Sequence, residues 1–539
     1  MKKRIVIVFL ILLTLFVGVA GRLAYLSGGA EITQYAGVTG SRVISVGINA
    51  ARGVIYDRNG VPLAGGEERC AVLCEPMSLS GESAEKLRAH AVNIEEEELD
   101  RKIAAGYPFL VYVDRPLGGV GLSGITALAR YGGLAQNLIG YINADGHGVA
   151  GIEAAMDDYL YADGYSYSAC FTADAARRAL AGYGIAFEGS ARPMTQGVTL
   201  SLDRQIQQIC EEVADERVER GVILVSDLET GQICAWVSRP TYDPNHVEQS
   251  LASGDAMLNK ALYSYCCGSV FKIVVTAAAL ENGVELPQDY ECTGAFAAGE
   301  HTIACAKREG HGILDGKTAF AQSCNPYFCE LAARVGAQKV LEMAEKFGLG
   351  QRTDLGCGIG DGGGQLPPLR DLSVSAALSN LAIGQGSLLV TPIQVLRLSA
   401  IIANGGQMMS FRLFESITDT DGNRTKITSE SVARMVISVD TATVIRDMME
   451  EAVRSGSGRP AAAAVYQSAV KTSSAETGIY EQGKPILHTW VTGFYPSQRP
   501  QYAIAVLVEG GSSGYVSTAP VFADIVDRMY GCGLVKPVV

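Results

Sequence analysis

The chain has 539 residues, of which 48% are hydrophobic and 19% are charged, and its formal net charge is −13. This length exceeds that of a single hydrophobic core, so we expect two or three folded domains rather than one domain or a disordered chain. The negative charge argues against a nucleic-acid partner, because binding to phosphates depends on lysine and arginine.

The first predicted element is a membrane-spanning helix over residues 5–26. Residues 5–21 carry no charge, and residues 23–26 can extend the run to the length of about 17–25 residues that crosses a bilayer. Three basic residues within residues 1–4 precede it, so the positive-inside rule predicts a cytoplasmic stub and a single-pass membrane protein whose bulk is extracytoplasmic. A cleaved signal peptide is the alternative, because Gly18-Val19-Ala20 fits a small-x-small cleavage site.

Residues 27–190 predict an irregular, β-rich domain, which we call the pedestal. Residues 51–66 alternate apolar and polar residues around a turn at Asp57–Gly60, a pattern typical of a β-hairpin. Residues 82–105 are charged and helix-like. None of these patterns indicates catalysis.

Residues 191–539 predict one α/β domain. Early strands are expected over 197–201 and on both sides of the Glu229–Gly231 turn, and late strands over 488–496 and 501–511. Between the early strands lies an amphipathic helix that begins after Asp203, a favourable cap residue. Because strands stand at both ends with helices between, we expect a mainly antiparallel sheet flanked by helices.

A serine–lysine pair stands out in this second domain. Ser269 and Lys272 are three residues apart, so on a helix they share one face, and a buried lysine of lowered pKa can activate a serine hydroxyl. The same S-x-x-K spacing recurs at Ser83–Lys86 and Ser468–Lys471, so the spacing alone is weak evidence for a catalytic pair. Only Ser269 opens an apolar helix, residues 273–280, which favours it as the nucleophile.

Two further motifs follow Ser269. Ser323-Cys324-Asn325 leads into another apolar helix, and Lys471-Thr472-Ser473 stands just before the late strands. Serine-x-x-lysine, serine-aspartate-asparagine and lysine-threonine-glycine together are the set used by penicillin-binding proteins and class A β-lactamases.

On these motifs the chain resembles the class B, monofunctional penicillin-binding proteins, which are peptidoglycan D,D-transpeptidases of the division and sporulation type. The resemblance extends over nearly the whole chain after the predicted membrane helix. It is carried by the segments ARGVIYDRNGVPLA, LIGYINADGHGVAGIE, VTLSLDRQIQQ, SRPTYDPN, LAIGQGSLLVTPIQ and HTWVTGFYPSQRPQYAIAVLVEGG, in that order.

The resemblance implies a role for each catalytic position. Ser269 would be the acylated nucleophile and Lys272 its general base. Ser323 would relay a proton to or from the leaving amine, Asn325 would hold the substrate amide, and Lys471 would support the proton network and bind the terminal carboxylate.

The resemblance also implies the binding positions and partners. Thr472 would bind the carboxylate beside Lys471, and the backbone N–H groups of Ser269 and Ser474 would form the oxyanion hole. The ligands would be peptidoglycan stem peptides and β-lactams, with no metal and no cofactor. A polytopic glycan polymerase of the SEDS type and other cell-wall assembly proteins would be the protein partners.

The chain departs from the family pattern at three positions. Ser473 replaces the usual glycine of the third motif, Cys267 replaces the proline before Gly-Ser, and Cys324 replaces aspartate. Ser473 either points away harmlessly or narrows the cleft. Two alternatives to a transpeptidase stay open: a D,D-carboxypeptidase or β-lactamase, and a weakly active or inactive scaffold or β-lactam sensor.

Thirteen cysteines leave at least one unpaired. We predict a disulfide between Cys292 and Cys305, with a zinc site of these two cysteines, His301 and His311 as the alternative. Cys267, Cys324 and Cys329 are interpreted as buried packing residues, since free cysteine behaves as a small hydrophobe.

Overall fold

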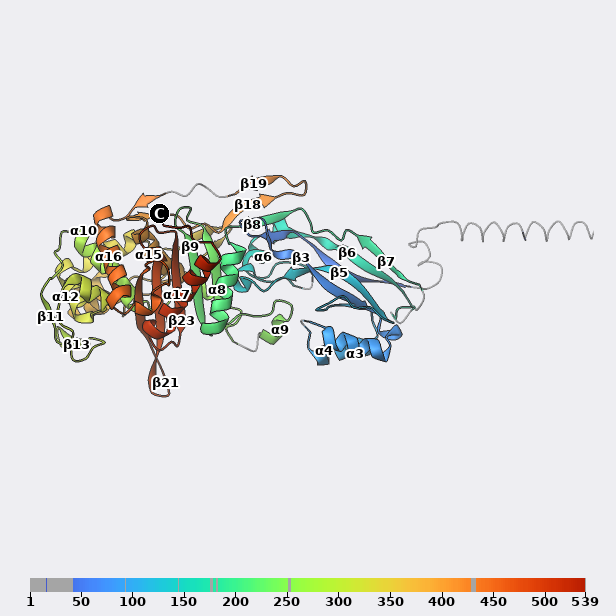
Figure 1. The fold of residues 1–539 in the computed structure, drawn as a ribbon, viewed down its shortest axis with the longest axis horizontal. Coiled ribbons are helices and arrows are strands. Elements are labelled where there is room, and N and C mark those ends of the chain that lie inside the picture. Colours follow the sequence, from blue (N-terminus) through green and yellow to red (C-terminus); the bar gives the residue numbers. More distant parts are fainter. Residues whose placement is uncertain are drawn as a thin grey trace, which may run out of the picture. The chain divides into compact units, whose positions relative to one another are not determined.

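The computed structural model describes residue 16 and residues 42–538, except 93, 144, 175–177, 181–182, 251–253 and 428–432 (Figure 1). The predicted membrane helix over residues 5–26 lies outside this part, apart from residue 16. Among the described residues, no helix has both the length and the apolar character needed to cross a membrane. The chain divides into two compact units: unit 1 holds residues 1–51, 66–130 and 163–193, and unit 2 holds residues 52–65, 131–162 and 194–539.

Unit 1 is rich in β-structure, as predicted for the N-terminal region. One of its sheets has the order β1 (Arg42–Arg52), β6 (Tyr161–Ala173), β7 (Ile185–Gly189). In a second sheet, β3 (Pro62–Cys74) pairs with β4 (Phe109–Tyr112) and β5 (Leu122–Tyr131). Helices α3 (Gly81–His90) and α4 (Glu96–Ala105) occupy the predicted helical stretch, and their buried Leu87 and Leu99 pack with Val72 of β3.

The predicted hairpin is present where the chain passes through unit 2. Strand β2 (Val54–Tyr56) pairs antiparallel with the start of β3, with Ile55 opposite Ala64. The Asp57 carboxylate accepts hydrogen bonds from the backbone N–H groups of Asn59 and Val61, each at 2.8 Å. This side chain therefore fixes the turn, as aspartate commonly does at such positions.

The centre of unit 2 is a five-stranded antiparallel sheet in which early strands pair with late ones, but the early strand predicted over 197–201 lies outside it, because β8 (Gly197–Leu200) pairs with β2 and β18 (Phe414–Thr418) instead. The order of the five strands is β10 (Ile233–Arg239), β9 (Gly221–Asp227), β23 (Tyr502–Glu509), β22 (Lys484–Tyr495), β21 (Ala469–Glu481). Val225 of β9 lies opposite Ile504 of β23. Successive residues of β9 enter different cores, Val222 and Leu224 on one face and Ile223 and Val225 on the other, because side chains alternate along a strand.

Helices cover both faces of this sheet (Figure 1). On one face lie α8 (Arg204–Arg217) and α17 (Ala519–Gly531), and on the other lie α10 (Lys272–Glu281) and α15 (Pro392–Ala403). Asp203 caps α8 as expected, because its side chain accepts from the N–H groups of Gln205 and Ile206. The mixed α/β fold predicted for this region is thus confirmed.

Unit 2 also contains further strands and helices. They are β8 (Gly197–Leu200), β11 (Tyr290–Cys292), β12 (Ala295–Ala298), β13 (His301–Ala304), β14 (Gly312–Leu314), α11 (Gly316–Ala321), α12 (Asn325–Val335), α13 (Ala337–Lys346), α14 (Ser375–Ala382), β18 (Phe414–Thr418) and α16 (Val439–Ser455). Two of them, α11 and α12, flank the second sequence motif.

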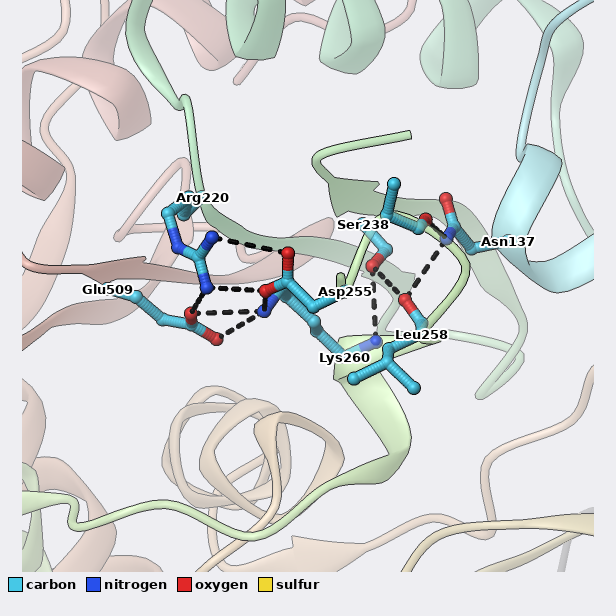
Figure 2. A network of polar contacts seen from close by, with 8 residues as sticks. Asn137, Arg220, Ser238, Asp255, Leu258, Lys260 and Glu509 are labelled. Carbon is cyan, nitrogen blue, oxygen red and sulfur yellow. Dashed lines mark hydrogen bonds and ion pairs between the residues drawn. The ribbon is translucent and has the colours of Figure 1, made fainter. Parts of the chain in front are cut away.

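A polar network anchors the segment that leads to Ser269 (Figure 2). The buried Lys260 ammonium lies 2.7 Å from Asp255 and 3.0 Å from Glu509 at the end of β23. Arg220 also contacts Glu509, at 3.5 Å. The Lys260 backbone N–H donates to Ser238 of β10 at 3.1 Å. The segment before the nucleophile is thus held at the edge of the sheet by charge pairs and a backbone contact.

Replacing Lys260 with alanine should lower the free energy of unfolding by about 1–3 kcal/mol, because Asp255 and Glu509 lose their buried ammonium partner and keep only the more exposed Arg220. Urea unfolding followed by tryptophan fluorescence would measure this, since Trp236 and Trp490 both lie in unit 2. Arg334→Ala is the matched control, because the exposed Arg334–Glu330 pair should contribute about 0.5 kcal/mol or less. Equal unfolding midpoints for the two variants would contradict the anchoring role.

Candidate active site

Ser269 lies in a tight turn at the start of α10. The turn is a 3₁₀ helix over Gly268–Phe271, and the Lys272 backbone N–H donates to the Ser269 carbonyl. Gly268 has a φ of 55°, and a Cβ added there would lie 2.4 Å from Ser473 Oγ, so only glycine fits. Ser269 is half-buried at this turn, and Lys272, three residues further along the chain, is the first residue of α10.

Lys272 connects the first motif to the second. Its side chain is fully buried, and its ammonium nitrogen donates to the Ser323 carbonyl at 2.8 Å, to Ser323 Oγ at 3.2 Å and to Asn325 Oδ1 at 2.8 Å. The Phe328 ring lies 5.2 Å from the same nitrogen. The structure therefore brings these residues together although 51 positions separate Lys272 from Ser323 in the chain.

Lys471 brings the third motif to the same point. It lies on β21, the edge strand of the central sheet, and its buried ammonium nitrogen donates to Ser323 Oγ at 3.0 Å. The Ser323 hydroxyl thus accepts from two lysines, which occupies both of its acceptor positions and leaves its O–H free to donate elsewhere. Ser323 adopts a φ of 56°, a conformation that non-glycine residues rarely adopt and that places its hydroxyl between the lysines.

Burial lowers the pKa of both lysines. The pKa of Lys272 falls from 10.5 to about 8, chiefly because the charged form is desolvated. The pKa of Lys471 lies well below its ordinary value, first because of burial and second because of the positive charge of Lys272. A neutral amine, which can accept a proton, is therefore accessible near physiological pH.

The rate of acylation by a β-lactam should rise with pH and reach half its plateau near pH 8. The expected rise follows from the predicted role of Lys272 as general base. Its neutral form would accept the serine proton, and this form accumulates as the pH rises through its lowered pKa. Stopped-flow acylation with a fluorescent penicillin between pH 6 and about 10 would give the profile. A rate that is flat across this range, or that falls as pH rises, would contradict a neutral lysine base.

The three predicted binding residues lie in succession on β21. The Thr472 hydroxyl lies 2.7 Å from the hydroxyl of Ser457 and is buried. Ser473 is also buried, and its hydroxyl donates to the Cys267 carbonyl at 2.7 Å. Ser474 is exposed, and its hydroxyl accepts from the Gly514 N–H at 3.0 Å.

The side chain of Ser473 therefore points toward the turn that carries the nucleophile. Ser473→Ala should reduce stability by about 1–3 kcal/mol, because the Cys267 carbonyl loses its partner in a buried place. We expect β-lactam acylation to slow as well, because the turn loses a support. Thermal unfolding and acylation rates of Ser473→Ala and Ser473→Gly would test this, and faster acylation in the glycine variant would show instead that the native serine obstructs the cleft.

The serines of the other two S-x-x-K matches do not join the cluster, although Lys471 of the Ser468 match belongs to it. Ser83 bonds with Ser80 at the start of α3, and Lys86 forms an exposed pair with Glu82. The Ser468 hydroxyl is buried and donates to the Ala461 carbonyl at 2.6 Å. Because the hydroxyls of Ser83 and Ser468 have partners away from the cluster, Ser269 stays the favoured nucleophile of the three serines.

The cysteine predictions need correction. Cys292 and Cys305 are free thiols, so the predicted disulfide is wrong. His301 is exposed on β13, and Cys324 takes its place beside Cys292, Cys305 and His311 in one cluster that could hold a metal ion. Cys324 is buried, as predicted for a packing residue. It also lies beside Cys292, Cys305 and His311, a contact that the sequence does not show.

Sequence reasoning also missed Gly384, which supports the nucleophile turn. Its carbonyl accepts from the Gly268 N–H at 2.9 Å, and a Cβ on Gly384 would lie 1.9 Å from the Gly268 carbonyl oxygen. The positive φ of 73° at Gly384 also favours glycine. The clustered glycines of LAIGQGS were the available signal, but they do not reveal which segment they approach.

Comparison with known proteins identifies the family. Residues 221–527 match the penicillin-binding protein transpeptidase domain. The chain is 32% identical over 430 residues to penicillin-binding protein PbpB of Mycolicibacterium smegmatis, an alignment that covers 73% of this chain and 63% of PbpB. It is 28% identical over 562 residues to stage V sporulation protein D of Bacillus subtilis, covering 97% and 85% of the two chains.

A solved structure shows the same architecture. Penicillin-binding protein 3 of Mycobacterium tuberculosis, complexed with ampicillin, matches with a TM-score of 0.64 and 25% identity over 92% of this chain and 97% of that one. The chain therefore belongs to the penicillin-binding protein transpeptidase family, as its motifs predicted. Its relatives also include the peptidoglycan D,D-transpeptidase FtsI of Escherichia coli, which is 26% identical over 514 residues, covering 89% of this chain and 83% of FtsI.

Proposed function

We propose that this chain is a peptidoglycan D,D-transpeptidase that cross-links stem peptides through an acyl-enzyme on Ser269. The observation that carries the proposal is the Ser323 hydroxyl, which accepts from both buried lysines next to the turn that holds Ser269. This arrangement joins the three motifs in one proton network, which a structural serine–lysine pair would not need.

In the first half of the reaction, neutral Lys272 takes the Ser269 proton as Oγ attacks the carbonyl of the D-Ala-D-Ala bond. The tetrahedral intermediate carries its negative charge on the former carbonyl oxygen. The backbone N–H groups of Ser269 and Ser474 would stabilise that oxyanion, and the positive end of α10 supports it. Lys471 and Thr472 would bind the terminal carboxylate.

When the intermediate collapses, the C–N bond breaks and D-Ala leaves as an amine. Its nitrogen needs a proton, and the Ser323 O–H can supply one because both lysines donate to its oxygen and can replace the proton. In the second half, an amine of a neighbouring stem peptide attacks the acyl-enzyme, gives its proton to the same network and releases Ser269.

The same site should accept β-lactams, which would acylate Ser269 and remain bound. The relative from Mycobacterium tuberculosis was crystallised with ampicillin. We further propose the layout predicted from the sequence: a cytoplasmic stub over 1–4, a membrane anchor over 5–26, a pedestal over 27–190 and an extracytoplasmic transpeptidase domain over 191–539. A SEDS-type glycan polymerase would be the membrane partner.

A reaction with a D-Ala-D-Ala stem peptide and an amine acceptor tests the proposal against its alternatives. We expect D-Ala release together with a cross-linked dimer, measured by mass spectrometry. D-Ala release without a dimer would favour a D,D-carboxypeptidase. A folded chain that binds penicillin but releases no D-Ala would favour a scaffold or sensor.

A further inference from the structure

A cluster of metal-binding side chains lies directly behind the second catalytic motif. Cys292, Cys305, His311 and Cys324 each point one ligand atom inward, and these four atoms all lie within 4.8 Å of one another. The three cysteines are buried, with 2%, 2% and 0% of their surfaces exposed, and His311 is half-buried. Three thiols and an imidazole are therefore gathered away from solvent.

The spacing within the cluster fits a tetrahedral ion. His311 Nδ1 lies 3.6 Å from Cys292 Sγ and 3.4 Å from Cys305 Sγ. With Zn–S bonds of about 2.3 Å and Zn–N bonds of about 2.0 Å, tetrahedral angles place a sulfur and a nitrogen ligand about 3.5 Å apart. The two sulfur–nitrogen separations in the structure lie on either side of this value.

The backbone around the ligands is fixed by short strands and close contacts. Cys292 ends β11 opposite Gly312 of β14, which begins directly after His311. A Cβ on Gly310 would lie 2.1 Å from the Cys292 carbonyl oxygen, and one on Gly294 would lie 2.0 Å from the Arg308 carbonyl oxygen. Glycine lets the two loops approach closely enough for their side chains to converge.

We propose that these four residues bind one Zn²⁺ ion as a closed structural site. Soft thiolates with one imidazole favour zinc over magnesium, calcium or manganese, which prefer oxygen ligands. Four protein ligands leave no open position for water or substrate, so the ion is not a catalytic Lewis acid.

The ion would also position the catalytic motif, because Cys324 stands between Ser323 and Asn325. Asn325 Nδ2 donates to the Ala304 carbonyl at 3.0 Å, and Ala304 directly precedes Cys305. Zinc bound to Cys305 and Cys324 therefore fixes both ends of this contact. It holds Ser323 where both lysines reach it.

Metal analysis of the full-length chain tests the binding step and does not depend on the proposed function. The chain is purified with zinc and a non-thiol reductant, and zinc is counted by mass spectrometry. We expect about one zinc per chain in the wild type and in Cys210→Ala, whose buried cysteine lies in the other core, but loss of zinc in Cys292→Ser and His311→Ala. A zinc-free wild type, or zinc retained in both ligand variants, would overturn the proposal.

Loading the wild-type chain with Co²⁺ tests the metal site without any variant, so this test holds even if Cys292→Ser and His311→Ala fail to fold. The wild-type chain loaded with Co²⁺ should show the intense visible bands of a tetrahedral ion together with thiolate-to-cobalt charge transfer. A weak octahedral spectrum would overturn the proposal. So would peptide mapping that finds a Cys292–Cys305 disulfide in the non-reduced chain.

The positioning step rests on the proposed function and is tested separately. Removing zinc with a chelator should slow penicillin acylation by about 10- to 100-fold, because small displacements of catalytic groups have effects of this size, and added zinc should restore the rate. Unchanged acylation after zinc loss would overturn the positioning role. A chain that contains zinc but is never acylated would instead refute the transpeptidase function and leave the metal site intact.

Discussion

Replacing Ser269 with alanine should abolish covalent labelling by fluorescent penicillin. In the proposed reaction the acyl bond forms on this hydroxyl, so its loss would remove the reaction rather than slow it. The fold should survive, because Ser269 is half-buried and the turn is held by backbone contacts of Gly268 and Lys272. Labelling followed on a denaturing gel, with circular dichroism for the fold, measures both expectations.

The other two S-x-x-K matches provide controls for this result. Ser83→Ala and Ser468→Ala should label like the wild type, although Ser468→Ala should lose about 1 kcal/mol of stability with its bond to Ala461. Labelling that persists in Ser269→Ala and disappears in Ser83→Ala or Ser468→Ala would assign the nucleophile to another motif.

Lys272→Met should slow acylation by about 10²- to 10⁴-fold, the usual contribution of a general base. Methionine has a similar length and avoids the cost of a buried charge, so the chain should still fold. The second-order acylation rate constant measures the effect, and the thermal midpoint checks the fold.

Lys86→Met is the matched control, because it removes the exposed lysine of another S-x-x-K match. Its acylation rate should equal that of the wild type. If Lys272→Met retained a rate within about threefold of the wild type, the general base would have to be another group, and Lys471 would be the first candidate.

The sequence predicted the elements and the motifs that local patterns define. The turn at Asp57, the cap at Asp203 and strands β9, β10, β22 and β23 follow from short apolar runs and turn chemistry, which act over a few residues. The order of the three motifs also pointed to the family. The convergence of Lys272 and Lys471 on Ser323 was expected only because that family is known.

Long-range packing explains what the sequence did not reveal. Cys324 meets Cys292 and Cys305 because strands β11 to β14 fold back beside the start of α12, and no periodicity encodes that contact. The direction of the Ser473 side chain could not be predicted either. A strand residue can point to either face of the sheet, and the Cys267 carbonyl that the hydroxyl contacts lies far away in sequence. Residues 52–65 and 131–162 belong to unit 2 because of contacts with residues far away in sequence, which local patterns do not show.

The central claim is that Ser269 carries the acyl group at the point where the three motifs meet. Peptide mapping by mass spectrometry after reaction with benzylpenicillin tests it most directly. We expect a single penicilloyl adduct on the peptide that contains Ser269, and fragmentation should place it on that serine. An adduct on any other residue, or none on a folded chain under conditions that acylate a control penicillin-binding protein, would contradict the account.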